Sequence, residues 1–313
     1  MKNNDKPLAG LRIGLFGKGG CGKSTTTVLL GTALKRRGYG VCILDADSTN
    51  LGLERSLGID TAPAPLLDYF GGMVFGGGLV TCPVDDPTPL PGAEVTLEQL
   101  PEPCVARSPD GVVFLVAGKI GGLGPGAGCD GPITKIARDL RVRDDGGDLV
   151  TLVDFKAGFE DSARGVITGL DWAVVVVDPT RAAVEMAVHL RDMVREIRAG
   201  ALPATHHLEG DLVQIANRAY RESRIRDAVV VLNRVREEEI ETYLLESLAT
   251  RGIEPIGALH EDLAIPVASL KGAPLAASGA AREAERFLDR FLEIVTAAAA
   301  PRLSEVGTGQ GVC

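Results

Sequence analysis

Short apolar runs alternate along the chain with longer stretches of helical periodicity. The runs are rich in Val, Ile and Leu and lie at 13–16, 41–45, 112–116, 149–154, 173–177 and 228–232. Helical periodicity is found at 23–37, 131–140, 160–170, 181–198, 237–251, 262–271 and 280–299. Continuous apolar strands separated by helices are typical of a parallel sheet covered on both faces. The pattern therefore predicts an α/β fold with a doubly wound, mainly parallel sheet and helices on both faces.

Length and composition agree with one large domain. The chain has 313 residues, of which 45% are hydrophobic, so it can bury a sizeable core. Because no linker divides it, we expect a single domain over 1–300, followed by a flexible tail at 301–313. The Gly- and Pro-rich segment 59–110 is expected to be a variable insertion near the carboxyl ends of the strands. The segment could be a partner-specific element or a structural cover for the sheet edge, and the sequence agrees about equally with both roles.

A glycine-rich loop joins the first predicted strand to the first predicted helix. Residues 17–25 match the phosphate-loop spacing G-x-x-x-x-G-K-S, in which backbone N–H groups and a helix N-terminus converge on an anion. We expect Lys23 to reach the β- and γ-phosphates, Ser24 to bind Mg²⁺ and Thr25 to approach the α-phosphate. The expected nucleotide-binding residues of the loop are Gly17, Gly19, Gly20, Cys21, Gly22, Lys23, Ser24 and Thr25.

A dinucleotide site is the competing interpretation of this loop. Gly17, Gly19 and Gly22 also spell G-x-G-x-x-G, and Asp45 ends the next strand, where a ribose-binding acid would lie. A dinucleotide site has no need for a lysine and a hydroxyl directly after the third glycine, whereas a triphosphate with Mg²⁺ needs both. The spacing therefore favours ATP and Mg²⁺ as cofactors.

A second lysine, Lys18, makes the loop more specific. The sequence K-G-G-x-G-K-S resembles that of the ATPase family with a deviant phosphate loop. This family includes the nitrogenase iron protein, the MinD/ParA site-selection and partition ATPases, and the nickel-insertion ATPases of carbon monoxide dehydrogenase. In that family the first lysine touches the phosphates of the partner's nucleotide. The resemblance therefore implies an ATP-dependent homodimer with Lys18 in a catalytic role at its interface, although a solvated loop lysine is the alternative.

Two further strand ends resemble the switch regions of this family. The resemblance implies that Asp47, in the stretch 41–51, positions the attacking water and senses Mg²⁺, while a plain turn role is the alternative. Asp154, at the end of a buried strand, is expected to belong to the Mg²⁺ site. The family motif D-x-P-A-G-I-E follows there with Lys156 in place of proline, so φ is not fixed at that position.

Pro179 and Asn233 follow the strands at 173–177 and 228–232. The resemblance implies that these two strand ends frame the adenine. Asn233 could equally be an ordinary strand-end asparagine, but the family register favours a contact with the base.

Cys129 gives the main indication of chemistry beyond ATP. Its glycine-rich turn, 124–132, resembles the place where the iron protein has a cluster cysteine and the nickel-insertion ATPases have a C-x-C pair. Residue 131 is glycine, and Ala157 stands at the second cluster position, so the four thiolates of a bridging cluster are not supplied. Two Cys129 thiolates across a dimer could hold Ni, Zn or Fe together with other ligands. A structural cysteine is about equally compatible with the sequence.

The other cysteines and the chain start bear on the compartment. No secretory signal or membrane-spanning stretch is seen, so we expect a cytoplasmic protein with thiols, not disulfides. Cys82 and Cys104 have no short metal-binding spacing and are assigned no role.

Charge argues against two kinds of partner. The net charge is −9, and the arginine-rich stretch 218–236 is more typical of a solvated helix face than of a DNA-binding patch. The C-terminal stretch 281–296 has an apolar face, but its acids offset its arginines, which disfavours binding to anionic lipid. Nucleic acid is therefore an unlikely partner, and no membrane is expected.

Three function classes remain, all of them ATP hydrolases. The leading one is a dimeric switch ATPase that matures or activates a client metalloenzyme, because Cys129 and the stretch 154–179 are most similar to the nickel-insertion group. The second is a spatial-organisation ATPase of the MinD/ParA type, which the arginines of 218–236 support. The third is a reductase component like the iron protein, against which Ala157 argues.

Overall fold

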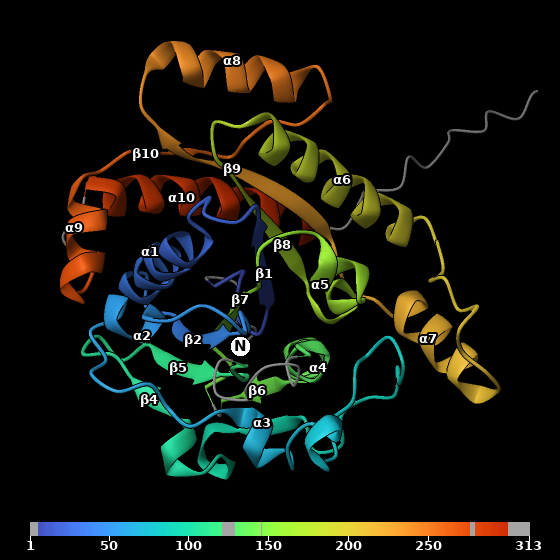
Figure 1. Ribbon diagram of the computed structural model, residues 1–313. Coiled ribbons are helices and arrows are strands. Elements are labelled where there is room, and N and C mark those ends of the chain that lie inside the picture. The colour runs from blue at the N-terminus through green and yellow to red at the C-terminus, as the bar shows by residue number, and fades with distance from the viewer. Residues whose placement is uncertain (1–5, 121–128, 145, 276–278, 300–313) are drawn as a thin grey trace, which may run out of the picture.

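The computed structural model describes residues 6–120, 129–144, 146–275 and 279–299 (Figure 1). An eight-stranded sheet has the order β10-β9-β8-β1-β7-β2-β5-β4. Neighbouring strands of this sheet pair in parallel, except that β4 pairs antiparallel with β5. The strands are β1 (Arg12–Gly17), β2 (Gly40–Asp45), β4 (Ala106–Arg107), β5 (Val113–Val116), β7 (Leu149–Asp154), β8 (Trp172–Val177), β9 (Asp227–Val235) and β10 (Ala258–His260). The predicted mainly parallel α/β sheet is confirmed.

Helices cover both faces of the sheet (Figure 1). One face packs against α1 (Lys23–Arg36), α2 (Leu53–Ser56), α9 (Ala264–Lys271) and α10 (Gly279–Ala299). The other packs against α4 (Gly131–Asp139), α5 (Glu160–Ala163), α6 (Arg181–Arg198) and α8 (Glu238–Ala249). In Figure 1, α7 (Asp211–Arg221) extends from the end of α6, away from the sheet. None of the helices in these described ranges is long and apolar enough to cross a membrane.

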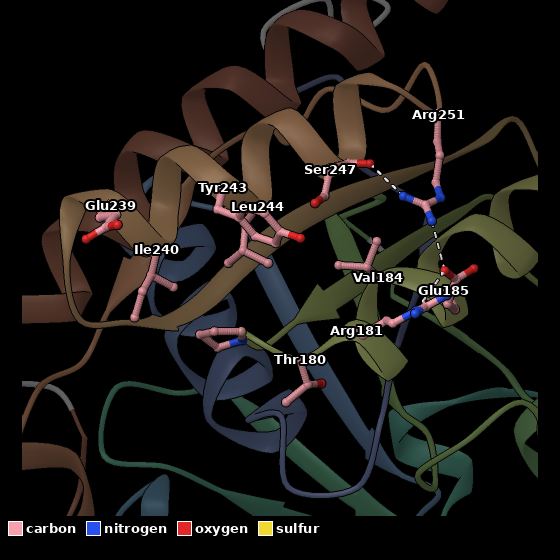
Figure 2. Close-up of a pocket in the computed structure, with 11 residues that line it drawn as sticks. Thr180, Arg181, Val184, Glu185, Glu239, Ile240, Tyr243, Leu244, Ser247 and Arg251 are labelled. Atoms are coloured by element: carbon pink, nitrogen blue, oxygen red, sulfur yellow. Dashed lines mark hydrogen bonds and ion pairs between the residues drawn. The ribbon is translucent and has the colours of Figure 1, made fainter.

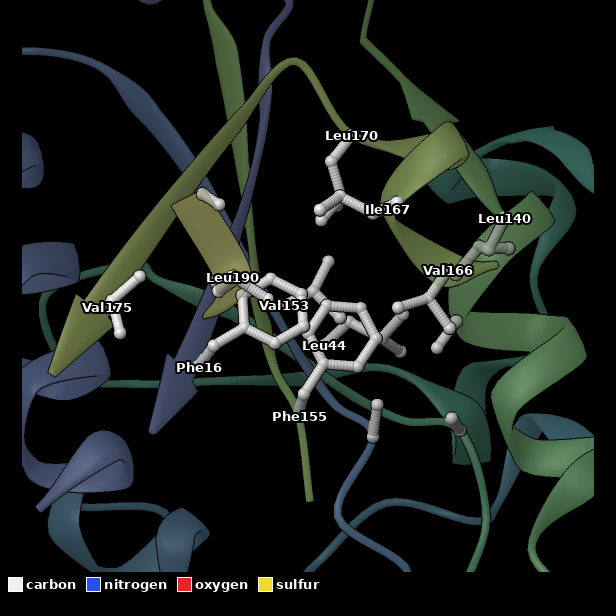
Figure 3. Close-up of a cluster of buried hydrophobic side chains, with 14 of the residues drawn as sticks. Phe16, Leu44, Leu140, Val153, Phe155, Val166, Ile167, Leu170, Val175 and Leu190 are labelled. Atoms are coloured by element: carbon white, nitrogen blue, oxygen red, sulfur yellow. The ribbon is translucent and has the colours of Figure 1, made fainter. Parts of the chain in front are cut away.

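The strand β1 shows why this sheet is apolar on both sides. Ile13 and Leu15 point into the cluster beneath α1 and α10, whereas Phe16 points into the opposite cluster. There Phe16 stacks on Phe155, with ring centroids 4.8 Å apart (Figure 3). A Cβ at Gly14 would lie 2.9 Å from the Phe155 ring, so glycine makes room for this stack. Side chains of β1 that point to opposite faces of the sheet are thus both buried, as expected of a central parallel strand.

One predicted helix needs correction, and some elements were not predicted. The helix expected at 160–170 is only the single turn α5 followed by a 3-10 turn, Val166–Gly169. Gly165, with φ of 82°, separates the two turns, because this conformation cannot continue an α-helix. The helix α7 was not predicted. The short strand β10 was also not predicted, since three residues give too brief an alternation.

The segment 59–110 covers one side of the sheet. It contains α3 (Leu66–Tyr69), β4, three 3-10 turns and β3 (Glu94–Thr96), which pairs in parallel with β6 (Arg141–Arg143) outside the main sheet. Apolar side chains such as Leu66, Val80 and Val95 are buried in the same cluster as α4. This packing supports the structural-cover interpretation. The domain boundary at 300 stays a prediction, and the tail at 301–313 lies outside the described residues.

Candidate nucleotide-binding site

The loop between β1 and α1 has the backbone of an anion cradle. Gly22, the residue directly before α1, has φ of 97°, a left-handed conformation that favours glycine. A Cβ there would lie 2.1 Å from the amide nitrogen of Asn233, and a Cβ at Gly17 would lie 2.6 Å from the carbonyl oxygen of Val176. Only glycine fits at these two positions. The loop therefore brings its own N–H groups and the N-terminus of α1 to one place.

Lys23 and Ser24 follow the loop on the first turn of α1. The ammonium of Lys23 is 3.4 Å from the carbonyl oxygen of Lys18, so it folds back over the loop. The hydroxyl of Ser24 donates to Asp154 at 2.6 Å and accepts from the Asn50 side chain at 2.9 Å. Three segments far apart in the sequence thus meet at Ser24. The sequence had not indicated Asn50, whose side chain was identified only by this contact.

Asp154, at the end of β7, is a fully buried carboxylate. Burial raises its pKa to about 6, although the Ser24 hydroxyl and the charge of Lys23 oppose the shift. Hydroxyl and carboxylate oxygens are the hard ligands that Mg²⁺ prefers, and a cation would offset the cost of this buried charge. The predicted pair Ser24 and Asp154 therefore fits Mg²⁺, which when bound would neutralise phosphate charge.

A neighbouring carboxylate, Asp45, is held by a residue that the sequence analysis missed. Lys119, just after β5, places its ammonium 2.7 Å from Asp45 and 2.6 Å from the carbonyl oxygen of Asp47. Burial raises the pKa of Asp45 to about 7, and Lys119 opposes that shift. Because Asp45 is 2% exposed and already paired, it is poorly placed to bind a ribose. This geometry disfavours the dinucleotide interpretation.

Asp47 lies beside the same loop. Its Oδ1 accepts hydrogen bonds from the backbone of Thr49 and Asn50 and from the Thr49 hydroxyl. Within the described part of the chain, its Oδ2 has no hydrogen-bond partner. Asp47 lines a cavity of about 300 Å³ with Lys23 and Ser24. The carboxylate is thus held through Oδ1, while Oδ2 is available beside the phosphate loop. The catalytic role of Asp47 stays a prediction.

The two residues predicted to frame the adenine lie at the same edge of the sheet, because β9 contains Asn233 and Pro179 follows the neighbouring strand β8. Asn233 is buried and donates to the carbonyl oxygen of Cys21 at 2.6 Å, so it supports the loop. Pro179 instead lines a cavity of about 570 Å³ between α6 and α8, with Val184 and Leu244 on its apolar wall (Figure 2). This cavity is larger than that at the loop, but the phosphate-binding groups line only the smaller one. An adenine contact by either residue stays a prediction.

Cys129 is half-buried just before α4, next to Asp130. Asp130 pairs with Lys156 at 2.8 Å and with Arg164 at 2.6 Å. Although burial acts in the opposite direction, these two cations lower the pKa of Asp130. Lys156 was noted in the sequence only as the replacement of a proline. In the fold it joins the strand end of Asp154 to the cysteine turn.

Cys82, to which the sequence gave no role, lies against the same turn. Its sulfur is 2.8 Å from where a Cβ of Gly131 would be, so it fills the space of a side chain at that position. No cluster of three or more His, Cys, Asp or Glu suited to a metal is found among the described residues. The rest of the predicted turn, 121–128, lies outside them.

The arginines of 218–236 do not form one patch. Arg218 and Arg221 are on α7, while Arg224 lies 3.8 Å from Asp171 and Arg236 pairs with Glu261 at 2.6 Å. The arginines thus lie on different elements, and their assignment to a solvated helix face stays a prediction.

We expect Asp154→Asn to stabilise the nucleotide-free protein at neutral pH. The raised pKa of Asp154, about 6 against an ordinary 3.8, means that the folded state binds the proton more tightly than the unfolded chain. Stability from this group is therefore complete below pH 4 and is lost as the pH rises to about 6, a loss of about 3 kcal/mol. Urea denaturation of the wild-type and Asp154→Asn proteins at pH 4 and pH 8, without Mg²⁺, measures this change in the free energy of unfolding. Equal pH dependence in the two proteins would contradict the assignment.

Comparison with known proteins identifies relatives that bind nucleotides. The family described as the CobQ/CobB/MinD/ParA nucleotide binding domain matches residues 15–275. The chain is 31% identical over 188 residues to an uncharacterized ATP-binding protein of Methanocaldococcus jannaschii, covering 58% of this chain and 73% of that protein. It is 28% identical over 204 residues to the carbon monoxide dehydrogenase accessory protein CooC of Rhodospirillum rubrum, covering 60% of this chain and 70% of CooC.

A solved structure supports the fold. The septum site-determining protein MinD of Pyrococcus horikoshii, complexed with Mg-ADP, superposes with a TM-score of 0.58 and 17% identity. The match covers 92% of this chain and 98% of that protein. At this identity the likeness concerns the architecture alone, which is that of a phosphate-loop ATPase.

Proposed function

This chain belongs to the CobQ/CobB/MinD/ParA nucleotide-binding domain family, and we propose that it is a Mg-ATP-dependent switch ATPase that serves a client metalloenzyme. In this proposal ATP closes a homodimer, with Lys18 at the interface, and hydrolysis to ADP and phosphate opens it again. The client receives or retains its metal according to the nucleotide state. The likeness to CooC over 60% of the chain supports this role.

The observation that carries the proposal is the link between the Mg²⁺ site and Cys129. Asp154, the proposed Mg²⁺ residue, is two positions from Lys156, and the Lys156 ammonium is 2.8 Å from Asp130, which follows Cys129. The hydrogen bond with Asp130 raises the pKa of Lys156, so the lysine stays charged and the pair persists. A movement of the chain after Asp154 on hydrolysis would therefore move the cysteine turn as well.

A soft metal ion is the proposed cargo of this turn. The two Cys129 thiolates of a dimer supply too few ligands for a stable site by themselves. Cys82 is a further donor, because its sulfur occupies the side-chain position of residue 131. Burial raises the pKa of the Cys82 thiol, and backbone N–H groups of Val84 and Asp85 oppose that shift. A bound nickel, zinc or iron ion would stabilise the thiolate further.

We expect Cys129→Ser to remove the metal while leaving ATP binding intact, because a hydroxyl is a far poorer ligand for a soft metal than a thiolate. Anaerobic titration of the protein with Ni²⁺ and Zn²⁺, with and without ATP, measures the site. ATP should increase the affinity of the wild-type protein for the metal, and the metal should increase its affinity for ATP by the same factor.

Three variants sharpen this experiment. Cys82→Ser should weaken metal binding, whereas the matched variant Cys104→Ser, in which a buried thiol elsewhere is changed, should not. Lys156→Ala should still bind both ATP and the metal, but ATP should no longer change the affinity for the metal. If the wild-type protein binds no metal above background, or the Cys129→Ser variant binds it equally well, the metal role is wrong.

The spatial-organisation role is the second candidate. It rests on the exposed arginines of α7, which could contact DNA phosphates. Salt-dependent DNA binding by the ATP-bound protein, lost in the Arg218→Gln variant, would favour it over the metallocentre role. An iron-protein-like reductase role is the least supported, because Ala157 supplies no thiolate.

A further inference from the structure

A third cavity, of about 470 Å³, lies at the edge of the sheet opposite to the phosphate loop. It is formed where β1 and β7 begin, beside β6 and the segment that follows α7. The six residues of β1 separate it from the loop, a span of roughly 17 to 20 Å. Its lining includes four arginines: Arg12, Arg141, Arg143 and Arg224.

Arg12 is an unusual residue for the start of a central strand, because its side chain is 3% exposed. Its guanidinium donates to the carbonyl oxygens of Ala137, Arg138 and Gly169, and its Nε has no partner. Among the described residues, no carboxylate lies within ion-pair distance of it. A buried cation with only carbonyl partners is costly, and a nearby anion would offset that cost.

Arg141, on β6, is in a similar position. One of its nitrogens donates to the carbonyl oxygens of Arg138 and Leu140, at 3.0 and 3.2 Å. Its remaining N–H groups have no partner, and no acid lies within ion-pair distance of it in the part of the chain that the structure describes. The half-buried guanidinium thus has donors to spare.

One buried acid, Asp171, offsets part of this positive charge. Asp171, which is 3% exposed, accepts the backbone N–H of Arg12 and lies 3.8 Å from Arg224. Burial lowers the pKa of both Arg12 and Arg141, and the charge of a neighbouring arginine lowers each further, whereas the charges of Asp171 and Asp139 oppose the shift.

The remaining acids of the lining lie at the rim. Glu94 is paired with Arg143, Asp144 accepts the N–H of Leu149, and Glu222 is exposed. Inside the cavity Arg12 and Arg141 thus outnumber the buried acid Asp171, which leaves an excess of positive charge.

We propose that this cavity binds a small phosphorylated anion, gripped by Arg141 and Arg224, with Arg12 beneath them as a fixed positive charge. Guanidinium groups suit phosphate oxygens because their planar donors can bind them in pairs. All four cations are arginines, which favours such directed contacts over diffuse attraction. The site is independent of the proposed function, since the phosphate loop takes no part in it.

Pyrophosphate without Mg²⁺ is the probe, and Lys23→Ala protein is the background, so that the phosphate loop does not compete for the anion. Calorimetric titration should give saturable binding with one anion per chain. Arg141→Gln should weaken it at least about 10-fold, because a charge-assisted contact is lost. Arg224→Gln, at a side chain that is 62% exposed, should weaken it several-fold.

Controls make the result decisive. Arg198→Gln, at an exposed position on α6, should bind pyrophosphate like its parent. Malonate, a dicarboxylate of similar charge, should bind more weakly than pyrophosphate if phosphate is the group recognised. The proposal would be overturned if pyrophosphate showed no saturable binding. It would also be overturned if the Arg141→Gln and Arg224→Gln proteins bound pyrophosphate as tightly as their Lys23→Ala parent.

Discussion

Asp47→Asn is expected to leave nucleotide binding almost unchanged and to lower the rate of ATP hydrolysis by about 100-fold or more. Asparagine retains an oxygen for the contacts that Thr49 and Asn50 make with Oδ1. It places an amide where the unpartnered Oδ2 would face water and metal, so the negative charge is lost while the local turn remains. Phosphoryl transfer depends mainly on such positioning and charge. Phosphate release under steady-state conditions, together with ATP affinity by calorimetry, separates turnover from binding.

The matched control is Asp60→Asn, the same chemical change at a carboxylate that is fully exposed and pairs with Arg55. It should hydrolyse ATP at the wild-type rate. Asp47 would be only a turn residue if the Asp47→Asn protein also turned over normally.

The second large effect concerns the two lysines of the phosphate loop. Lys23→Ala should weaken ATP binding about 100-fold or more, because Lys23 is 6% exposed and its ammonium lies over the loop, where the phosphates would be. Lys18→Ala removes the same charge five residues earlier in the chain. If Lys18 acts across the proposed dimer interface, this variant should bind ATP as a monomer but should not dimerise.

Calorimetry and light scattering with ATP distinguish the two outcomes. Unchanged ATP affinity in the Lys23→Ala protein would refute the phosphate-loop assignment. Normal ATP-dependent dimers of the Lys18→Ala protein would remove Lys18 from the interface and with it the proposed sandwich of two nucleotides.

Much of the fold could be predicted because its signals are local. The strands of the sheet centre are continuous apolar runs, since each is buried on both faces, and α6 was expected at the residues where it is found, 181–198. The segment 160–170 was misjudged because the left-handed conformation of Gly165 depends on its surroundings. The short strands lack enough residues of regular pattern to be recognised, whereas the eleven residues of α7 have an amphipathic pattern that was overlooked in the sequence.

The sequence alone determined the phosphate loop. Glycines, lysine and hydroxyl stand next to one another in the chain, so their spacing already defines the cradle. It likewise determined that Asp154 ends a buried strand, because an acid follows an apolar run.

Only the tertiary structure decided which distant residues complete the site. Lys119 reaches Asp45 across 74 positions, and Lys156 reaches Asp130 across 26. The sulfur of Cys82 takes the space that Gly131 leaves open, and Arg12 meets Arg141 in one cavity. These contacts arise because parallel strands bring the ends of separate segments to the same edge of the sheet. A local pattern of side chains carries no record of which strands become neighbours, and so it could not predict them.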